Sequence, residues 1–277
     1  MLPLLCKITF LCWVLWRESA LGWTIGDGRM QVFSTLTATT QDQFDVHSGA
    51  LIQKNGVRIP SYQLYGEYGY NANSSAGINF KISQYSGVKN ERTTVFDYLQ
   101  IFHRHQKRWG HFAFTQQHLF KFGGIYDQDK MPVFAQSKQN DYEYRILLGH
   151  HLGRVSPFTC SCYFSAAELA LRERFGLGFT EIRADLTLSV PLDHKSSLLM
   201  QMFNLYKVYS VTTNESMRAM SDIELRKPNI SKLSIGVLTV LDPHKSIWFG
   251  MIKQVAGINQ MNESGIFMTY RYLYDGK

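Results

Sequence analysis

The chain has 277 residues, 45% of them hydrophobic and 14% aromatic, a length that suits one or two soluble domains or a single membrane barrel. The formal net charge is +7, but basic and acidic residues are interleaved and no basic block or nucleic-acid motif is present, so we expect no nucleic-acid partner. Beyond the first residues no apolar stretch reaches the ~20 residues of a membrane helix, which argues against a helical membrane protein.

The N-terminus has the pattern of a cleavable signal peptide over residues 1–22. Lys7 precedes an apolar run at 8–16, and Ala20 and Gly22 offer small residues for cleavage before Trp23. We therefore predict one mature domain, 23–277. Its Cys-x-Cys pair at 160–162 has no second pair to complete a metal site, so we expect no cofactor.

Segment after segment of the mature chain alternates apolar and polar residues with a period of two, as expected of strands with one apolar and one polar face. In chain order these segments are 30–39, 59–70, 75–86, 93–105, 110–121, 142–151, 163–174, 179–190, 197–209, 231–240, 245–256 and 264–274. Each has roughly the ~9–11 residues of a tilted membrane strand. The sequence predicts an all-β fold, a closed antiparallel up-and-down transmembrane β-barrel of about twelve strands. An aromatic-rich soluble β-protein is the alternative.

The connections between these segments indicate an orientation. The longest ones, 40–58, 122–141 and 210–230, are the first, fifth and ninth, so in a meander they share one side. Most connections on the other side are short turns such as 71–74 and 242–244. Outer-membrane barrels have short periplasmic turns and longer outer loops. We therefore predict an integral protein of the bacterial outer membrane with both termini in the periplasm.

The two faces of the strands receive different roles, because a cation facing lipid at the bilayer midplane costs ~2–4 kcal/mol. The predicted lipid-facing residues are Tyr62, Leu64, Tyr68, Ile78, Phe80, Ile82, Tyr144, Ile146, Leu148, Ile182, Leu186, Leu188, Tyr270, Tyr272 and Tyr274. The predicted lumen-facing residues are Glu67, Lys81, Glu143, Arg145, Glu168, Arg172, Glu181, Arg183, Asp185 and Arg271. Segments 93–105 and 197–209 are mixed, and their alternation does not separate two faces.

Several short motifs resemble one group of proteins. Gly22-Trp23-Thr24 followed by Gly28, the segments 181–188 and 256–259, and the aromatic final segment are similar to a family of uncharacterised proteobacterial outer-membrane barrels. The resemblance spreads over most of the mature chain. It implies a small barrel in a Gram-negative cell of alphaproteobacterial type, with outer-membrane lipid, lipopolysaccharide and the assembly machinery as partners. It implies no catalytic residues.

Two sets of residues are candidates for chemistry. His103, His105 and His111 flank a predicted turn and form a weak candidate zinc or copper site, the alternative being histidines at a membrane interface. Serine–histidine neighbours occur at 47–48, 194–196 and 244–246, all in predicted loops or turns. Because no nucleophile elbow or nucleotide-binding loop accompanies them, we do not expect an enzyme.

The predicted function follows from the barrel. Charges of both signs inside about twelve strands either pair and plug the interior or line a path for small solutes. The sequence therefore predicts a small porin-like channel or passive surface protein. The alternatives are a structural or host-interaction protein that presents its long outer loops to host surface molecules, or an outer-membrane barrel enzyme.

Overall fold

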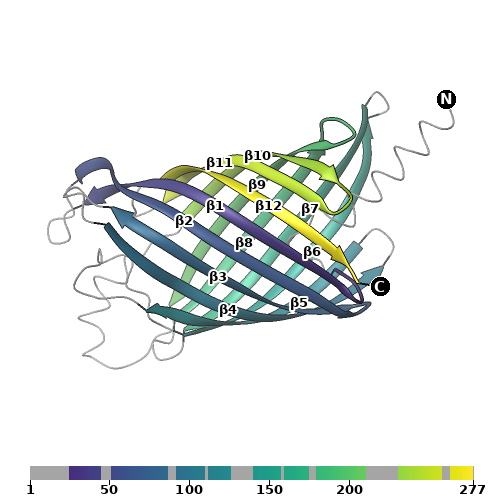
Figure 1. Ribbon diagram of the computed structural model, residues 1–277, viewed down its shortest axis with the longest axis horizontal. Coiled ribbons are helices and arrows are strands. Elements are labelled where there is room, and N and C mark those ends of the chain that lie inside the picture. The colour runs from purple at the N-terminus through teal and green to yellow at the C-terminus, as the bar shows by residue number, and fades with distance from the viewer. Residues whose placement is uncertain are drawn as a thin grey trace.

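The computed structural model describes residues 25–44, 51–86, 92–109, 112–125, 140–156, 159–174, 179–209, 230–257 and 263–276. In these ranges the chain forms twelve strands (Figure 1): β1 (Arg29–Phe44), β2 (Leu51–Asn71), β3 (Ser74–Ser86), β4 (Arg92–Trp109), β5 (Phe112–Ile125), β6 (Asp141–Ser156), β7 (Thr159–Arg174), β8 (Phe179–Pro191), β9 (Ser196–Tyr209), β10 (Ile230–Asp242), β11 (Lys245–Gly257) and β12 (Glu263–Asp275). Each segment expected from the alternation overlaps one of these strands. The predicted all-β, antiparallel up-and-down architecture is confirmed.

The first and last strands meet. Every strand pairs antiparallel with its neighbours in sequence, and β1 also pairs with β12, so the sheet closes into a barrel. The β1–β12 register runs without interruption from Arg29 opposite Asp275 to Gln41 opposite Glu263. An ion pair between Arg29 Nε and Asp275 Oδ1, 3.0 Å apart, lies at the end of this seam. Closure leaves neither β1 nor β12 with an unpaired edge.

The barrel has two different ends. At one, which we call the termini end, β1 begins, β12 ends and the short connections after β2, β4, β6, β8 and β10 lie. At the other, the loop end, the β5–β6 and β9–β10 connections comprise residues 126–140 and 210–229. The strands run farther than the sequence predicts at this end, so the β1–β2 connection comprises only 45–50.

Asn and Asp side chains close three of the short turns at the termini end. Asn71 Oδ1 accepts a hydrogen bond from the amide of Asn73 at 2.9 Å, and Asp242 Oδ1 accepts one from His244 at 2.8 Å. Asp193 Oδ1 accepts two, from Lys195 at 2.7 Å and from Ser196 at 2.8 Å. Such local bonds make Asn and Asp favourable turn residues and fix where each strand reverses.

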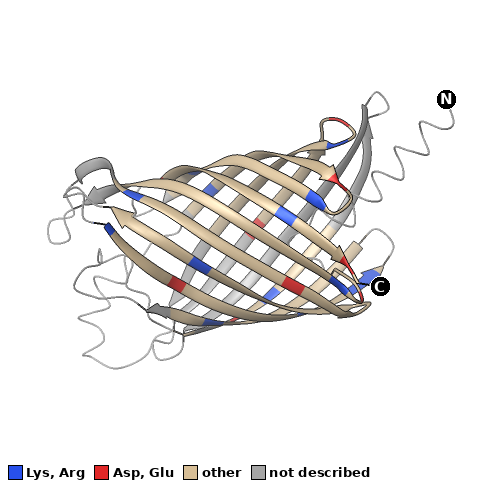
Figure 2. Cartoon of the chain, viewed as in Figure 1, with Lys and Arg blue, Asp and Glu red and all other residues tan. Residues whose placement is uncertain are grey.

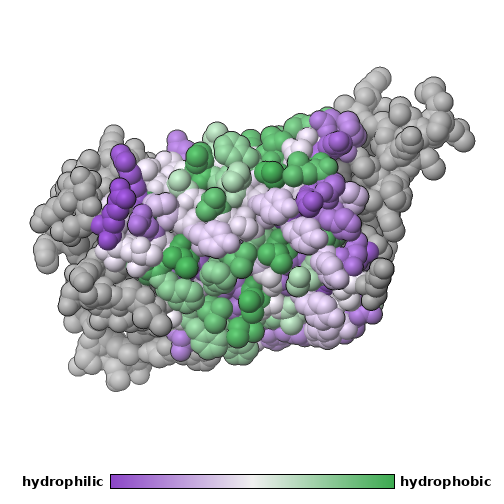
Figure 3. Space-filling view, viewed as in Figure 1, coloured by the Kyte–Doolittle hydropathy of each residue, from purple (hydrophilic) through white to green (hydrophobic). Residues whose placement is uncertain are grey.

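The outer wall carries an apolar belt. Figure 3 shows hydrophobic side chains across the middle of the barrel, with more hydrophilic ones toward both ends. Large apolar residues such as Ile78 and Leu148 are about half exposed, at 50% and 55%. The residues beside them in sequence, Asn79 and Leu147, are buried on the inner face. No helix among the described residues has the length and apolar character needed to cross a membrane.

Candidate functional site: the barrel lumen

The predicted lumen residues with described side chains fall on the inner face. Glu67, Glu143 and Arg271 are buried there, and Lys81, Arg145 and Asp185 are partly buried. The side chains of Glu168, Arg172, Glu181 and Arg183 lie outside the described set. The backbone register nevertheless places Arg172 between Glu143 and Glu181, and Glu168 opposite Asp185.

The predicted lipid-facing residues occupy the other face. Those that are most exposed are Tyr68, Ile78, Leu148, Leu186, Tyr270, Tyr272 and Tyr274. Tyr62, Leu64, Phe80, Ile82, Tyr144, Ile146 and Leu188 are partly exposed on the same face of their strands. The side chain of Ile182 is not among those described.

Near the termini end, the buried carboxylate of Glu67 is the centre of a hydrogen-bonded network on the inner face. Glu67 Oε2 accepts hydrogen bonds from Gln31 Nε2 at 2.7 Å and from the Tyr65 hydroxyl at 2.6 Å. Ser75 Oγ donates to the other carboxylate oxygen. Arg104 Nη1 lies 3.1 Å from Glu67 Oε2 and forms an ion pair with it.

The same arginine extends the network to the neighbouring strand. Arg104 Nη1 donates to the Tyr65 hydroxyl at 2.8 Å, and Arg104 Nε donates to Gln117 Oε1 at 3.1 Å. We name these residues the Glu67 cluster: Gln31, Tyr65, Glu67, Ser75, Arg104 and Gln117. The side chain of Glu67 is 0% exposed and that of Arg104 is 4% exposed. A pair withdrawn this far from water is tolerated only because every charge has close partners.

Aromatic rings support the cluster from one side. The Tyr65 and Phe102 rings stack with centroids 5.2 Å apart, and the Arg104 guanidinium lies 4.8 Å from the centre of the Phe102 ring. Gly77 makes room for this arrangement, since a Cβ at that position would lie 2.4 Å from Phe102 Cζ. Side chains of β1 to β5 therefore pack together on the inner wall near the termini end.

Arg104 is one of the inner-face charges that the sequence pattern did not identify, and Asp97, Lys232 and Glu263 are others. Lys81 on β3 pairs with Tyr98 and Ile82 pairs with Phe96, so Asp97 is an extra residue in β4. This β-bulge changes the inward parity of β4, because Val95 and Asp97 point inward before it and Gln100, Phe102 and Arg104 point inward after it. The switch in parity explains why segment 93–105 does not separate into two faces.

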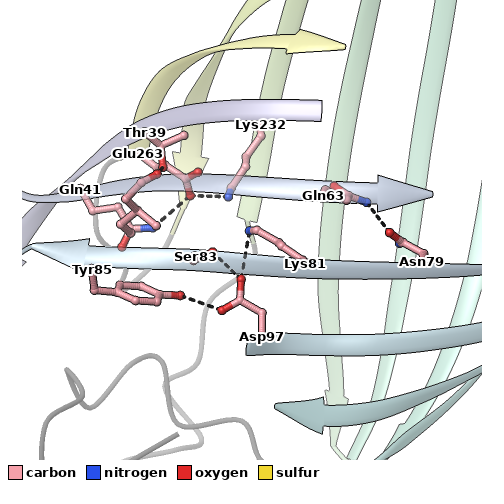
Figure 4. Close-up of polar contacts among 11 residues, drawn as sticks. Thr39, Gln41, Gln63, Asn79, Lys81, Ser83, Tyr85, Asp97, Lys232 and Glu263 are labelled. Carbon is pink, nitrogen blue, oxygen red and sulfur yellow. Dashed lines mark hydrogen bonds and ion pairs between the residues drawn. The ribbon is translucent and has the colours of Figure 1, made fainter. Parts of the chain in front are cut away.

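Two further clusters lie toward the loop end (Figure 4). In the Asp97 cluster, Asp97 Oδ2 accepts from Ser83 and lies 3.7 Å from Lys81 Nζ, and Asp97 Oδ1 accepts from the Tyr85 hydroxyl at 3.5 Å. In the Glu263 cluster, Glu263 Oε2 accepts from Lys232 Nζ at 2.5 Å and from Gln41 Nε2 at 3.2 Å. Lys232 reaches Glu263 across β11, which lies between their strands.

An uncharged layer separates the Glu67 cluster from the loop-end clusters. Gln63 Nε2 donates to Asn79 Oδ1 at 2.9 Å, and Asn79 Nδ2 donates to Gln100 Oε1 at 2.7 Å. Figure 4 shows Gln63 and Asn79 to one side of Lys81, and the register places Glu67 farther along β2 in the same direction, opposite Gly77. Along the barrel axis, the inner wall of β2 to β4 therefore carries an ion pair, then a ladder of amide side chains, then a second ion pair. Figure 2 shows that charged residues are dispersed over the strands.

His103 and His105, the candidate metal residues that the structure describes, lie outside the lumen. His103 is exposed and its Nε2 is 2.5 Å from the Tyr70 hydroxyl, while His105 Nδ1 is 3.0 Å from Ser74 Oγ. His118, opposite His103, bonds through Nδ1 to the Tyr142 hydroxyl at 2.6 Å. No three metal-binding side chains converge among the described residues. His111 lies outside the described residues, so the three-histidine arrangement stays a prediction.

The serine–histidine neighbours show no catalytic arrangement where they are described. His194 is in the β8–β9 turn, and Ser196, the first residue of β9, donates from its backbone amide to Asp193 Oδ1. His244 bonds through Nδ1 to the carbonyl of Leu273 at 3.1 Å, whereas Ser246 is buried on the inner face of β11. The pair at 47–48 lies outside the described residues.

Comparison with known proteins gives a fold and no family. No protein family and no curated protein matches the sequence. Among solved structures, an outer membrane channel from Pseudomonas putida F1 aligns with a TM-score of 0.65 at 10% identity, over 93% of this chain and 99% of that one. The KdgM porin aligns with a TM-score of 0.50 at 6% identity, over 86% and 98%. The β domain of the Bordetella autotransporter BrkA aligns with a TM-score of 0.50 at 13% identity, over 89% and 99%.

These likenesses define the class of fold. The chain has the β-barrel architecture of outer-membrane proteins, shared by channels and by autotransporter domains. At such low identity the likeness extends to the fold alone.

Proposed function

We propose that this protein is a narrow porin-like channel of a bacterial outer membrane that passes small polar solutes passively. The observation that carries the proposal is the division of one closed wall into an apolar, aromatic outer face and an inner face of paired charges and amides. A soluble barrel would reverse this arrangement, because its apolar face would have to be buried. Solved barrels of the same fold include channels and porins.

The lumen suggests where solutes would be selected. The charged groups of the Asp97 and Glu263 clusters keep contact with solvent, with exposed fractions from 15% to 32%. The ion pair of the Glu67 cluster is closed to solvent. We propose that the loop end is the wide entrance of the channel and that the Glu67 cluster is its constriction. Charges of both signs at both levels favour small zwitterionic or neutral polar solutes over highly charged ones.

Planar-bilayer recording of the refolded protein tests the proposal. We expect small, ohmic steps from the wild type and larger steps from the double variant Glu67→Ser/Arg104→Ser, which removes the constriction without leaving one buried charge unpaired. Lys107→Ser is the control, since Lys107 is an exposed residue of β4, the strand that carries Arg104. Heat-modifiable migration in detergent shows that each sample is folded. Electrical silence of folded wild type and of the folded double variant would rule out the channel.

Several proposals concern parts that the structure does not describe. We propose that residues 1–22 are a signal peptide and that the loop end faces outward, with both termini in the periplasm. The origin in an alphaproteobacterial-type family, the recognition by the assembly machinery and the absence of enzymatic activity stay predictions. A host-interaction role would depend on loop residues outside the described ranges. Surface proteolysis of intact cells at 126–140 and 210–229 tests the orientation.

A further inference from the structure

A row of cations crosses the outer wall at the loop end. The register places Lys253 opposite Ser264, Ser264 opposite Thr40, Thr40 opposite Arg58, Arg58 opposite Ser86 and Ser86 opposite Arg92. Residues that are paired across a sheet project from the same face, so these six side chains share the outer face. Lys253, Arg58 and Arg92 are all exposed. We call these three residues the outer cation row.

The position of the row is unusual for a membrane wall. A cation that faces lipid costs ~2–4 kcal/mol at the midplane and about 0–1 kcal/mol near the interface. Long basic side chains lower that cost by extending toward the headgroups. The strands are tilted against the barrel axis (Figure 1), so the row is inclined: Arg92 and Arg58 lie nearest the loop end, and Lys253 lies farther from it. The guanidinium groups of Arg58 and Arg92 are therefore the ones placed to reach headgroup level in the leaflet at the loop end.

No described side chain neutralises these two arginines. Arg58 and Arg92 have no ion pair or hydrogen bond to a described side chain. The outward neighbours next to them along the strands are Pro60 on β2 and Thr94 on β4. Among the side chains that the structure describes, no acidic one projects from the outer face of β1 to β4; the side chain of Asp42 on β1 lies outside that set. The row therefore presents positive charge on the outer wall with no acidic partner among the described side chains.

A shallow apolar groove lies next to the row on the outer wall, on the side away from the loop end. It crosses the outer wall from β11 to β4 and is lined mainly by apolar side chains, including Leu36, Ala38, Pro60, Tyr62, Ile266 and Met268. Its lining also includes the small side chains of Ala38 and Pro60, which lie side by side on β1 and β2. Six strands at ~4.8 Å spacing give the groove a width on the order of 25 Å, which is enough for several acyl chains side by side.

We propose that the outer cation row and the groove next to it bind one phosphorylated, multiply acylated glycolipid of the lipid A type. Arg58 and Arg92 are two strands apart, about 10 Å, so each guanidinium can hold a separate phosphate group through its fork of N–H donors. The acyl chains would occupy the groove. A phospholipid with one phosphate and two chains would use only part of this surface. The inference rests on the proposed function insofar as it requires a barrel with its loop end in the outer leaflet.

Titration of the detergent-refolded full chain tests this site. Native mass spectrometry with lipid A, and separately with phosphatidylglycerol, gives stoichiometry and affinity. We expect one lipid A per barrel, bound more tightly than phosphatidylglycerol. Arg58→Gln and Arg92→Gln should each weaken lipid A binding roughly fivefold, since one cation near an anionic lipid surface is worth about 1 kcal/mol. The double variant should show the product of the two effects.

Lys107→Gln is the matched control, because Lys107 is an exposed cation at the opposite end of the barrel. It should bind lipid A like the wild type. Unchanged binding by the double variant, an equal loss in Lys107→Gln, or equal affinity for phosphatidylglycerol would overturn the site. Conductance plays no part in this measurement, so a silent channel that still binds lipid A would refute only the proposed transport. Loss of the heat-modifiable shift would instead report failure of the barrel itself.

Discussion

The Glu67 and Asp97 clusters contain the same chemical groups in different surroundings. Each has one carboxylate, one basic side chain, a serine and a tyrosine on the strands β2 to β4. The carboxylate and cation are 3.1 Å apart and 0% and 4% exposed in the first cluster. They are 3.7 Å apart and 15% and 32% exposed in the second. The two clusters occupy opposite halves of one continuous wall.

The difference shows that burial determines what an ion pair contributes to a barrel. In the Glu67 cluster each partner has lost water and depends on the other, so the pair fixes the packing of the interior. In the Asp97 cluster water still reaches both charges, so the pair adds little stability. We expect the charges of the Asp97 cluster instead to attract or repel ions that pass through the lumen. One wall can thus hold a structural barrier and a selective surface.

Loss of Arg104 should have the largest effect. Arg104→Gln leaves Glu67 buried without a cation, and we expect it to destabilise the barrel by about 3–5 kcal/mol. Glu67→Gln should cost less than that, and the double variant less than the sum of the two. Urea unfolding of the protein in lipid vesicles, followed as a double-mutant cycle, measures the coupling. Additive effects would mean that the pair is as hydrated as the Asp97 cluster.

The packing beneath the cluster gives a second, smaller effect. The position of a Cβ on Gly77 lies 2.2 Å from the Gly66 carbonyl oxygen and 2.4 Å from Phe102 Cζ, whereas a Cβ on Gly66 meets nothing closer than Ile78 Cγ1 at 3.9 Å. Gly77→Ala should therefore destabilise the barrel by about 1–3 kcal/mol, the usual cost of overpacking. Gly66→Ala is the matched control and should leave the urea midpoint nearly unchanged. Equal midpoints for the two variants would show that the interior near Phe102 is loosely packed.

The Asp97 cluster should affect permeation more than stability. Asp97→Asn leaves Lys81 with a neutral neighbour and should raise the anion-to-cation permeability ratio about twofold to fivefold, while unfolding changes by less than ~1 kcal/mol. Reversal potentials across a salt gradient measure the ratio. Glu67→Gln provides the contrast, because its buried carboxylate should alter stability first. A large loss of stability in Asp97→Asn with unchanged selectivity would reverse the roles assigned to the clusters.

The smallest effect concerns a turn outside both clusters. Backbone amides of Lys195 and then Ser196 donate to Asp193 and hold the pKa of its carboxyl below its ordinary value. A lowered pKa means that the ionised side chain stabilises the folded turn at neutral pH, and that this contribution is lost as pH falls through the folded-state pKa. Asp193→Ala should lower the urea midpoint slightly at neutral pH and leave it unchanged in acid. A difference that persists in acid would assign the effect to something other than the ionised carboxylate.

Sequence alternation located the strands because the side-chain period of a strand does not depend on what surrounds it. In the described parts of strands with one polar and one apolar face, burial follows the alternation, and Glu67 on β2 and Arg271 on β12 are both buried. The pattern failed in β4, where one inserted residue moved Arg104 to the inner face. A change of parity within a single segment is the sequence signal that could have indicated this bulge. In β9 the inner face itself carries apolar residues such as Leu199, so polarity there did not mark the lumen.

The sequence by itself determined the all-β meander, the short turns with their Asn and Asp residues and the face that each regular strand presents. These properties depend on residues a few positions apart, so local spacing encodes them. Only the tertiary structure decided that Arg104 meets Glu67 across 37 residues and that Lys253, Arg58 and Arg92 form one row. Such contacts depend on the register of strands distant in sequence and on one bulge, and period-two alternation carries no information about which residue lies opposite which.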